Sequence, residues 1–443
     1  MSDGTGHLLA PARKLPVLAR PDVLVVGGGA AGVMAACAAA RAGASVLLAE
    51  RAGFLGGTMT SVTLGGLCGA FVHTRGQIRP IVGGLYSELI ERLEHRRAVS
   101  APRIHGFVHG VPYDPEALRG VLDEIVLEAG VRLLLHAHVS EVVREGRRVD
   151  WVEVETSSGR AAIRPKVVVD CSGDAEVVFR GRGSFSLGDG GRTQHASSMF
   201  RMSGVDAEAF FSVPRHAIDA ILLAAVLEGE RLSRTSVAVY PSPVEGVAHL
   251  NATRVQREDG EPFDLTDPWQ FAQAEVEGRR QAALYARVAN ERLPGFSKAR
   301  IVALGASLGV RETRLIAGDR TLSGDDVLHG VKPEDRIACS AWPIEDHATG
   351  GKTIWKPLAD GDWYGIPFGC LVSRDFDNVL VAGRCLSATH AAQASARVAA
   401  TCMAMGEAAG MASSMALKAD GRVRVDVLDL QSRLRRAGAI LEL

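Results

Sequence analysis

A GxGxxG turn between two apolar segments restricts the fold of this 443-residue sequence more than any other feature. Residues 23–26, VLVV, form a short apolar run of the kind found in strands that are buried on both faces. Gly27, Gly29 and Gly32 follow, and an Ala-rich segment typical of a helix comes next. A second apolar run, SVLLAE, ends at Glu50. This order predicts one βαβ unit of a parallel sheet.

The same turn predicts a dinucleotide site. The first glycine makes the turn, the second lets the backbone approach a pyrophosphate, and the third packs the helix on the strand. The helix N-terminus offers N–H groups and a positive dipole end to phosphates, and Glu50 stands where an acid binds a ribose hydroxyl. An ordinary tight turn is the alternative. The expected site residues here are Gly27, Gly29, Ala31, Gly32, Glu50 and Arg51.

Composition excludes several classes of protein. Apolar residues make up 47% and charged residues 23% of the chain, as in globular proteins. The net charge of −1 gives no reason to expect a nucleic-acid partner. Apolar runs fall far short of the roughly 20 residues that span a bilayer, and no signal peptide is visible, so we expect a cytoplasmic protein without a membrane partner. The seven cysteines contain no CxxC pair, which argues against a metal site.

The pattern of elements changes along the chain and predicts its organisation. Residues 1–20 read as an N-terminal arm, and residues 21–180 carry the nucleotide-binding pattern. Residues 181–365 mix strand-like runs with helices, and the first pattern returns in 366–443. The predicted fold class is therefore α/β, with a Rossmann-like domain in two sequence pieces and an inserted α+β substrate lobe.

Several blocks, taken in order, resemble one family. It is the FAD-dependent oxidoreductases of the GFLGG, GVRETR and AGRCISATH type, within the glutathione reductase and fumarate reductase flavoprotein superfamily. The blocks here are GFLGGTMT, VVVDCSGDAEV, LGVRETRLIAGDRTLSGDDVL and NVLVAGRCLSATHAAQASARV. The resemblance covers nearly the whole chain and is weakest over about 205–295. It implies noncovalent FAD and an inserted substrate lobe.

The resemblance also implies further FAD contacts. A glycine pair in GFLGG touches the pyrophosphate, a strand backbone faces the adenine, and two later turns approach the cofactor. The residues at these positions are Gly56, Gly57, Thr58, Val139, Gly173, Asp174, Gly383 and Arg384. Arg384 replaces the acid found in many flavin enzymes and puts a cation beside the pyrophosphate. A helix expected to start at about Ala399 would stabilise anionic reduced flavin.

Candidate catalytic residues lie in segments that the resemblance places near the flavin ring. His347 in WPIEDH is the leading candidate for a base, with Glu345 on the same side of an extended segment. Arg311 and Arg314 are typical carboxylate anchors, and one of them is expected to bind a structural acid instead. A surface histidine and packing arginines are the alternatives. The full set is His347, Arg311, Tyr364, His390 and Arg397.

These residues predict an FAD-dependent dehydrogenase that transfers hydride from a small organic substrate to flavin N5. No second glycine turn follows a strand, so the expected electron acceptor is O₂ or an unknown molecule rather than a nicotinamide bound in its own domain. The alternatives are a flavin monooxygenase and a non-catalytic FAD-binding redox partner. Covalent attachment of FAD through Cys68 or His73 also stays open, as does a homodimer.

Overall fold

A five-stranded parallel sheet forms the centre of the protein, whose computed structural model describes residues 13–105, 108–347 and 352–443. All neighbouring strands of this sheet pair in parallel. In spatial order the strands are β24 (Val379–Val381), β13 (Val167–Asp170), β2 (Val23–Val26), β3 (Val46–Ala49) and β9 (Arg132–Leu134). Because β24 comes from the end of the chain and pairs with β13, the predicted assembly of this domain from two sequence pieces is confirmed.

The sheet is covered on both faces, which explains why all four residues of β2 are buried. Val23 and Val25 pack with the helices, whereas Leu24 and Val26 pack with a second sheet. The helices on the first face are α1 (Ala30–Arg41), α3 (Leu85–His95), α4 (Pro115–Glu128), α11 (Ala399–Ala416) and α12 (Val427–Arg436). The second sheet contains β1 (Val17–Ala19), β10 (His138–Glu145), β11 (Arg148–Thr156) and β12 (Gly159–Ile163). Part of the expected arm is thus a strand, since β1 pairs with β12.

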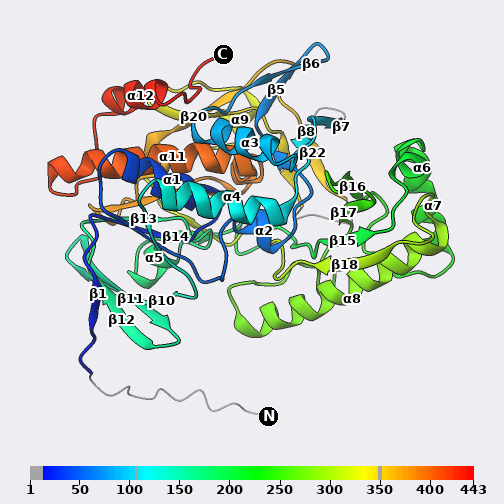
Figure 1. Ribbon diagram of the computed structural model, residues 1–443, viewed down its shortest axis with the longest axis horizontal. Coiled ribbons are helices and arrows are strands. Elements are labelled where there is room, and N and C mark those ends of the chain that lie inside the picture. The colour runs from blue at the N-terminus through cyan, green and yellow to red at the C-terminus, as the bar shows by residue number, and fades with distance from the viewer. Residues whose placement is uncertain (1–12, 106–107, 348–351) are drawn as a thin grey trace.

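Helices α1 and α11 lie side by side although they come from opposite ends of the chain (Figure 1). Two glycines of α11 allow this approach. A Cβ at Gly406 would lie 2.1 Å from the carbonyl oxygen of Ala31, and one at Gly410 would lie 2.1 Å from that of Ala35. No side chain fits between the two backbones at these positions.

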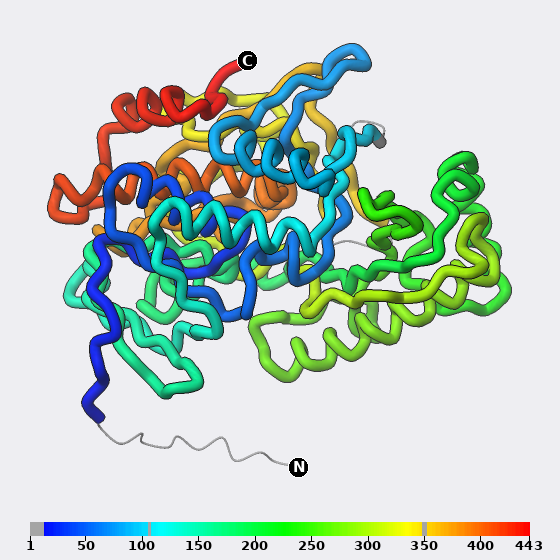
Figure 2. Tube along the Cα trace, in the orientation of Figure 1, coloured from blue at the N-terminus to red at the C-terminus, as the bar shows by residue number. Residues whose placement is uncertain are grey.

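A separate lobe, residues 196–308, has its own core and lies to one side of the main body (Figures 1 and 2). It consists of an antiparallel sheet and three helices. These elements are β16 (Ala238–Pro241), β17 (Val247–Asn251), β15 (Phe200–Ser203), β18 (Arg300–Leu304), α6 (Ala207–Phe211), α7 (Arg215–Leu227) and α8 (Pro268–Arg292).

The lobe is smaller than the predicted range of 181–365. Strand β20 (Arg336–Ser340) pairs with β23 (Tyr364–Pro367), and Ile337 and Trp363 belong to the core of the main body. The predicted range grouped these short strands with the lobe, whereas β20 packs against α11 and pairs with β23 in the main body.

The remaining elements are short and connect these parts. The helices among them are α2 (Thr58–Ser61), α5 (Glu176–Arg180), α9 (Gly324–Leu328), α10 (His390–Ala396) and the 3₁₀ turns η1 (Phe368–Cys370) and η2 (Leu417–Ala419). The strands are β4 (Leu67–Cys68), β5 (Phe71–Thr74), β6 (Gln77–Pro80), β7 (Arg103–His105), β8 (Val108–Val111), β14 (Phe185–Leu187), β19 (Arg314–Ile316), β21 (Ile344–Asp346) and β22 (Ile354–Lys356). Within the described residues, the helices are too short or too polar to cross a membrane.

The buried carboxyl of Glu407 in α11 predicts a pH-dependent stability. Burial raises its pKa to about 7, although the N–H of Leu85 donates to it. Between about pH 4.5 and 7 the folded chain therefore binds more protons than the unfolded chain. We expect the free energy of unfolding to fall as pH rises through this window, by up to about 3 kcal/mol relative to Glu407→Gln.

Urea unfolding of both proteins at several pH values measures this difference. Glu88→Gln is the control, because its effect on the pH dependence of stability has the opposite sign. Arg41 lowers the pKa of Glu88, so the stability that this ion pair contributes is lost as pH falls. Identical pH dependence in the wild type and Glu407→Gln would contradict the assignment.

Candidate functional site

Three glycine turns lie at the carboxyl ends of three adjacent strands. Gly27 follows β2, Gly173 follows the end of β13, and Gly383 follows β24, with φ of 94°, 78° and 95°. Glycine adopts these positive φ values without steric cost. Ligands of open parallel sheets bind at this edge, so the three turns mark the expected place for a nucleotide.

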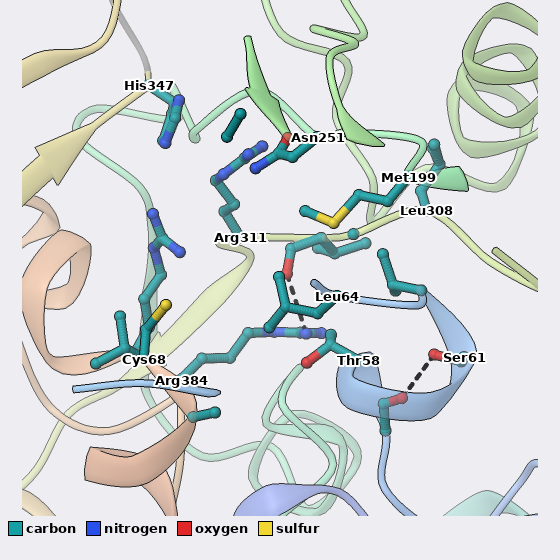
Figure 3. Close-up of a pocket in the computed structure, with 18 of the residues that line it drawn as sticks. Thr58, Ser61, Leu64, Cys68, Met199, Asn251, Leu308, Arg311, His347 and Arg384 are labelled. Carbon is teal, nitrogen blue, oxygen red and sulfur yellow. Dashed lines mark hydrogen bonds between the residues drawn. The ribbon is translucent and has the colours of Figure 1, made fainter. Parts of the chain in front are cut away.

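All three turns open onto one cavity of about 1370 Å³. This volume exceeds the roughly 300–1,000 Å³ of a typical small-molecule site, so the cavity has room for a cofactor and a second molecule. It extends into the lobe, where Met199 and Leu308 face Thr58 and Arg384 across the cavity (Figure 3). The lobe wall is mostly apolar. It includes Met199, Phe210, Phe211, Ile218, Val237 and Val239.

The glycine turn forms a cradle that leaves room for a Cβ at Gly29 but not at Gly27, Gly28 or Gly32. Glu50 fixes it by accepting hydrogen bonds from the N–H of Gly28 at 2.6 Å and of Ala52 at 2.8 Å. Gly57, with φ of 52°, approaches so closely that a Cβ there would lie 2.9 Å from the Cα of Gly29. The N-terminus of α1 also lines the cavity, and together these groups fit a pyrophosphate.

The cavity brings together most of the predicted cofactor residues. Those that line it are Gly27, Gly29, Ala31, Glu50, Arg51, Gly57, Thr58, Gly173, Gly383 and Arg384. Four others lie behind the wall. Gly32 packs on the carbonyl of Gly27, Gly56 donates its N–H to Gly28, and Asp174 binds Arg384. His138 lines the cavity in place of the neighbouring Val139.

Arg384 connects three segments, a role that the sequence did not predict. Its Nε donates to the carbonyl of Gly173 at 2.8 Å, Nη1 to that of Val310 at 3.1 Å, and Nη2 to Asp174 at 2.7 Å. Burial raises the pKa of Asp174, but Arg384 and Arg51 outweigh it and lower that pKa below its usual range. The ion pair therefore stays charged and joins the ends of β13 and β24 to the segment that precedes Arg311.

His347, Arg311 and Arg397 all line the cavity near the lobe, as predicted for the catalytic side (Figure 3 labels the first two). The imidazole Nε2 of His347 lies 3.0 Å from Glu345 Oε1, and its Nδ1 lies 3.1 Å from Thr353 Oγ1. Arg397 Nη2 lies 3.9 Å from Glu345 Oε2. Glu345 is therefore the shared partner of the histidine and an arginine.

The electrostatics of His347 oppose the role of general base that was predicted for it. Burial and the neighbouring Arg311 lower its pKa to about 3, although Glu345 acts in the other direction. The imidazole is therefore neutral at pH 7 and a weak proton acceptor. Its contact with Glu345 makes it a positioning group in this arrangement.

The structure does not bring the other two catalytic candidates to the cavity. Tyr364 is fully buried, its hydroxyl lies 2.6 Å from Ser395 Oγ, and burial raises its pKa to about 12. His390 lies between Glu312 and Asp346 at 2.7 and 3.3 Å. These carboxylates outweigh burial and raise its pKa to about 10, so it is an imidazolium at neutral pH.

The structure places the two members of two further candidate pairs differently, Arg311 and Arg314 in one pair and Cys68 and His73 in the other. Arg314 points away from the cavity and stacks on Phe179, 3.8 Å from the ring centroid, so it is the structural member of the GVRETR pair. Cys68 lines the cavity, whereas His73 pairs with Asp360 elsewhere. Burial raises the pKa of Cys68 to about 12, which keeps it a thiol.

The lobe supplies cavity residues that sequence reasoning missed. Arg234 donates from Nε to the carbonyl of Ala252 at 2.9 Å and from Nη2 to Asn251, and Tyr240 lies nearby on β16. These residues sit in ordinary strand and loop patterns without a motif. A single sequence contains no signal that would have selected them.

Comparison with known proteins gives a family and several distant relatives. The family model described as FAD dependent oxidoreductase matches residues 22–434. Digeranylgeranylglycerophospholipid reductase 1 of Methanopyrus kandleri is 31% identical over 165 residues, which cover 37% of this chain and 42% of that protein. The matched region thus spans less than half of the curated relative's length.

The solved structures that match this chain are more distant in sequence. A geranylgeranyl bacteriochlorophyll reductase-like protein from Thermoplasma acidophilum is 13% identical, with 94% of this chain and 83% of that chain covered and a TM-score of 0.45. The anhydrotetracycline hydroxylase OxyS from Streptomyces rimosus is 14% identical, with 94% and 66% covered and a TM-score of 0.45.

Two glycine substitutions should separate cofactor binding from folding. An added Cβ at Gly29 would meet only the Cα of Gly57, at 3.8 Å, so Gly29→Ala should fold normally but weaken FAD binding at least tenfold. A Cβ at Gly32 would lie 1.7 Å from the oxygen of Gly27, so Gly32→Ala should destabilise the chain itself. FAD titration and thermal unfolding of the apoprotein measure the two effects. Unchanged FAD affinity in Gly29→Ala would contradict the cradle.

Proposed function

The chain belongs to the FAD dependent oxidoreductase family, and on that premise we propose that it is a dehydrogenase that oxidises an organic substrate bound in the lobe half of the cavity. Bound FAD supplies the acceptor for a hydride. The observation that carries the proposal is the single cavity, which joins the three glycine turns to an apolar wall through a cluster of charged side chains. O₂ or another small molecule is the proposed electron acceptor.

The chain's own residues bind and orient the substrate. The apolar lobe wall excludes water and holds the carbon skeleton. Arg311 offers guanidinium N–H groups to an anionic or carbonyl oxygen. Among the residues that the structure describes, its side chain makes one hydrogen bond, from Nη1 to the carbonyl of His195 at 2.6 Å. Helix α11 starts at Ala399 on the cavity wall, so its positive end stabilises negative charge there.

A monooxygenase is the second candidate, and the apolar character of the lobe wall favours it because oxygen insertion also requires a dry site. The name of the Methanopyrus kandleri relative, a phospholipid reductase, supports an apolar substrate for this chain as well. The two candidates differ in the fate of oxygen. With ¹⁸O₂, a dehydrogenase places no label in the organic product, whereas a monooxygenase places one atom there.

Flavin reduction tests the proposal directly. Denaturing the purified protein should release FAD, and an anaerobic screen of organic acids and apolar alcohols should find compounds that bleach the bound flavin. Release without bleaching by any compound would favour a non-catalytic redox partner. Protein that stays colourless after reconstitution would contradict the proposal itself.

The neutral state of His347 predicts the pH profile of flavin reduction. With a pKa near 3, His347 should contribute no ionisation between pH 5 and 8, and His347→Ala should slow reduction about tenfold at every pH by releasing Glu345. Stopped-flow reduction at saturating substrate measures both proteins. If the wild-type reduction rate changes with an apparent pKa near 6.5 and this change is absent in His347→Ala, His347 is a general base after all.

A further inference from the structure

The lobe end of the cavity carries more positive charge than the chain neutralises. Arg234, Arg311 and Arg397 line it, and Arg254 lies behind them, where Nη2 donates to the carbonyl of His347 at 2.7 Å. Besides burial, the groups that act most on the charge of Arg311 are three other arginines and the single carboxylate of Glu345. Burial and the nearby Arg397 lower the pKa of Arg311 to about 9. Glu345 is therefore the carboxylate that acts most on Arg311, whereas Glu312 also acts on Arg397 and Asp346 acts on Arg254.

Three of the other carboxylates near this cluster have cationic partners, which leave them less able to neutralise it. Asp174 pairs with Arg384, and Glu312 and Asp346 share the one imidazolium of His390. On the lobe wall, Glu275 pairs with Arg279, and Asp219 lines the cavity together with Arg215 of the same helix. His347 is neutral and adds no charge. The surplus of positive charge is therefore a property of the folded chain.

The hydrogen bonds of these arginines are also incomplete. Within the described part of the chain, the buried Nε of Arg397 and the buried Nε and Nη1 of Arg254 have no partner. Arg314, close by in sequence, instead stacks on Phe179 and pairs with Glu176. Buried N–H groups without a partner and a surplus of buried positive charge are both unfavourable, so the arrangement favours an anion that enters the cavity from outside the chain and meets Arg311 and Arg397.

An apolar chamber adjoins this charge in the same cavity. Phe210, Phe211 and Ile218 come from α6 and α7, and Val237 and Val239 come from β16 and the segment before it. A molecule that uses both regions has a charged end and an apolar body.

We propose that the substrate is an anionic amphiphile, whose carboxylate or phosphate head binds Arg311, Arg234 and Arg397 and whose apolar body fills the chamber. The proposal rests on the proposed function, because it names the substrate class of the same cavity. Reduced, anionic flavin is the other source of negative charge that these arginines would meet.

The test uses oxidised holoenzyme, in which the pyrophosphate of FAD is already bound and the flavin ring is neutral. At constant ionic strength, octanoate, octyl phosphate, octan-1-ol and octylamine are titrated, and binding is followed by calorimetry and by the flavin absorption spectrum. We expect both anions to bind at least tenfold more tightly than the alcohol, with the amine weakest. From butanoate to octanoate, each methylene should add about fourfold in affinity. Equal affinity for octanoate and octan-1-ol would overturn the proposal.

Substitutions identify the residues that cause the preference for anionic ligands. Arg311→Gln should reduce the preference for octanoate over octan-1-ol at least tenfold and leave the affinity for octan-1-ol unchanged. Arg320→Gln is the matched control, because Arg320 is 41% exposed and pairs with Asp335 outside the cavity. If Arg311→Gln does not fold, Arg397→Gln and the wild-type ligand series decide the question.

The reduction potential of the flavin separates the two sources of negative charge. An Arg311→Gln protein with a lower potential and an unchanged octanoate preference would assign the arginines to reduced flavin and overturn the proposal. FAD content is measured first in every protein. Loss of FAD would count against the proposed function, whereas full FAD content without an anion preference counts against the substrate class alone.

Discussion

The contact between α1 and α11 is the constraint on which the site depends. Gly406 and Gly410 let the two backbones meet at Ala31 and Ala35, where any side chain would separate them. Ala31 lies in the first turn of α1, directly after the glycine cradle. A shift of α11 would therefore move the cradle as well. The same contact brings the N-termini of both helices to the cavity, where their dipoles add positive potential.

Charge is distributed unevenly along this cavity. At the edge of the sheet, Arg384 is neutralised by Asp174 and joins the two sequence pieces of the main body. Near the lobe, Glu345 is the one carboxylate among the groups that act most on Arg311. The first arrangement stabilises the fold, and the second leaves charge available to a ligand. Both use buried arginines, so burial alone does not distinguish a structural cation from a binding one.

Local sequence was enough to predict the glycine turns that the structure places on the cavity. The turn at Gly27, with its positive φ, depends on a few neighbouring residues. The segment that begins at Thr389 was less well predicted. Its polar residues form the short helix α10 before α11 begins, and Thr389 caps it by accepting from the N–H of Ala392. The predicted helix start at about Ala399 is confirmed by α11, whereas the short helix before it was not predicted.

The sequence by itself determined the βαβ unit, the glycine turns and the residue types at the cavity, since each depends on backbone freedom or periodicity over a few positions. Only the tertiary structure decided the protonation of the histidines and the partners of the arginines. His347 and His390 have the same side chain, yet burial beside Arg311 lowers one pKa, and two carboxylates raise the other. These differences arise from groups brought together from distant segments, which one-dimensional patterns do not contain.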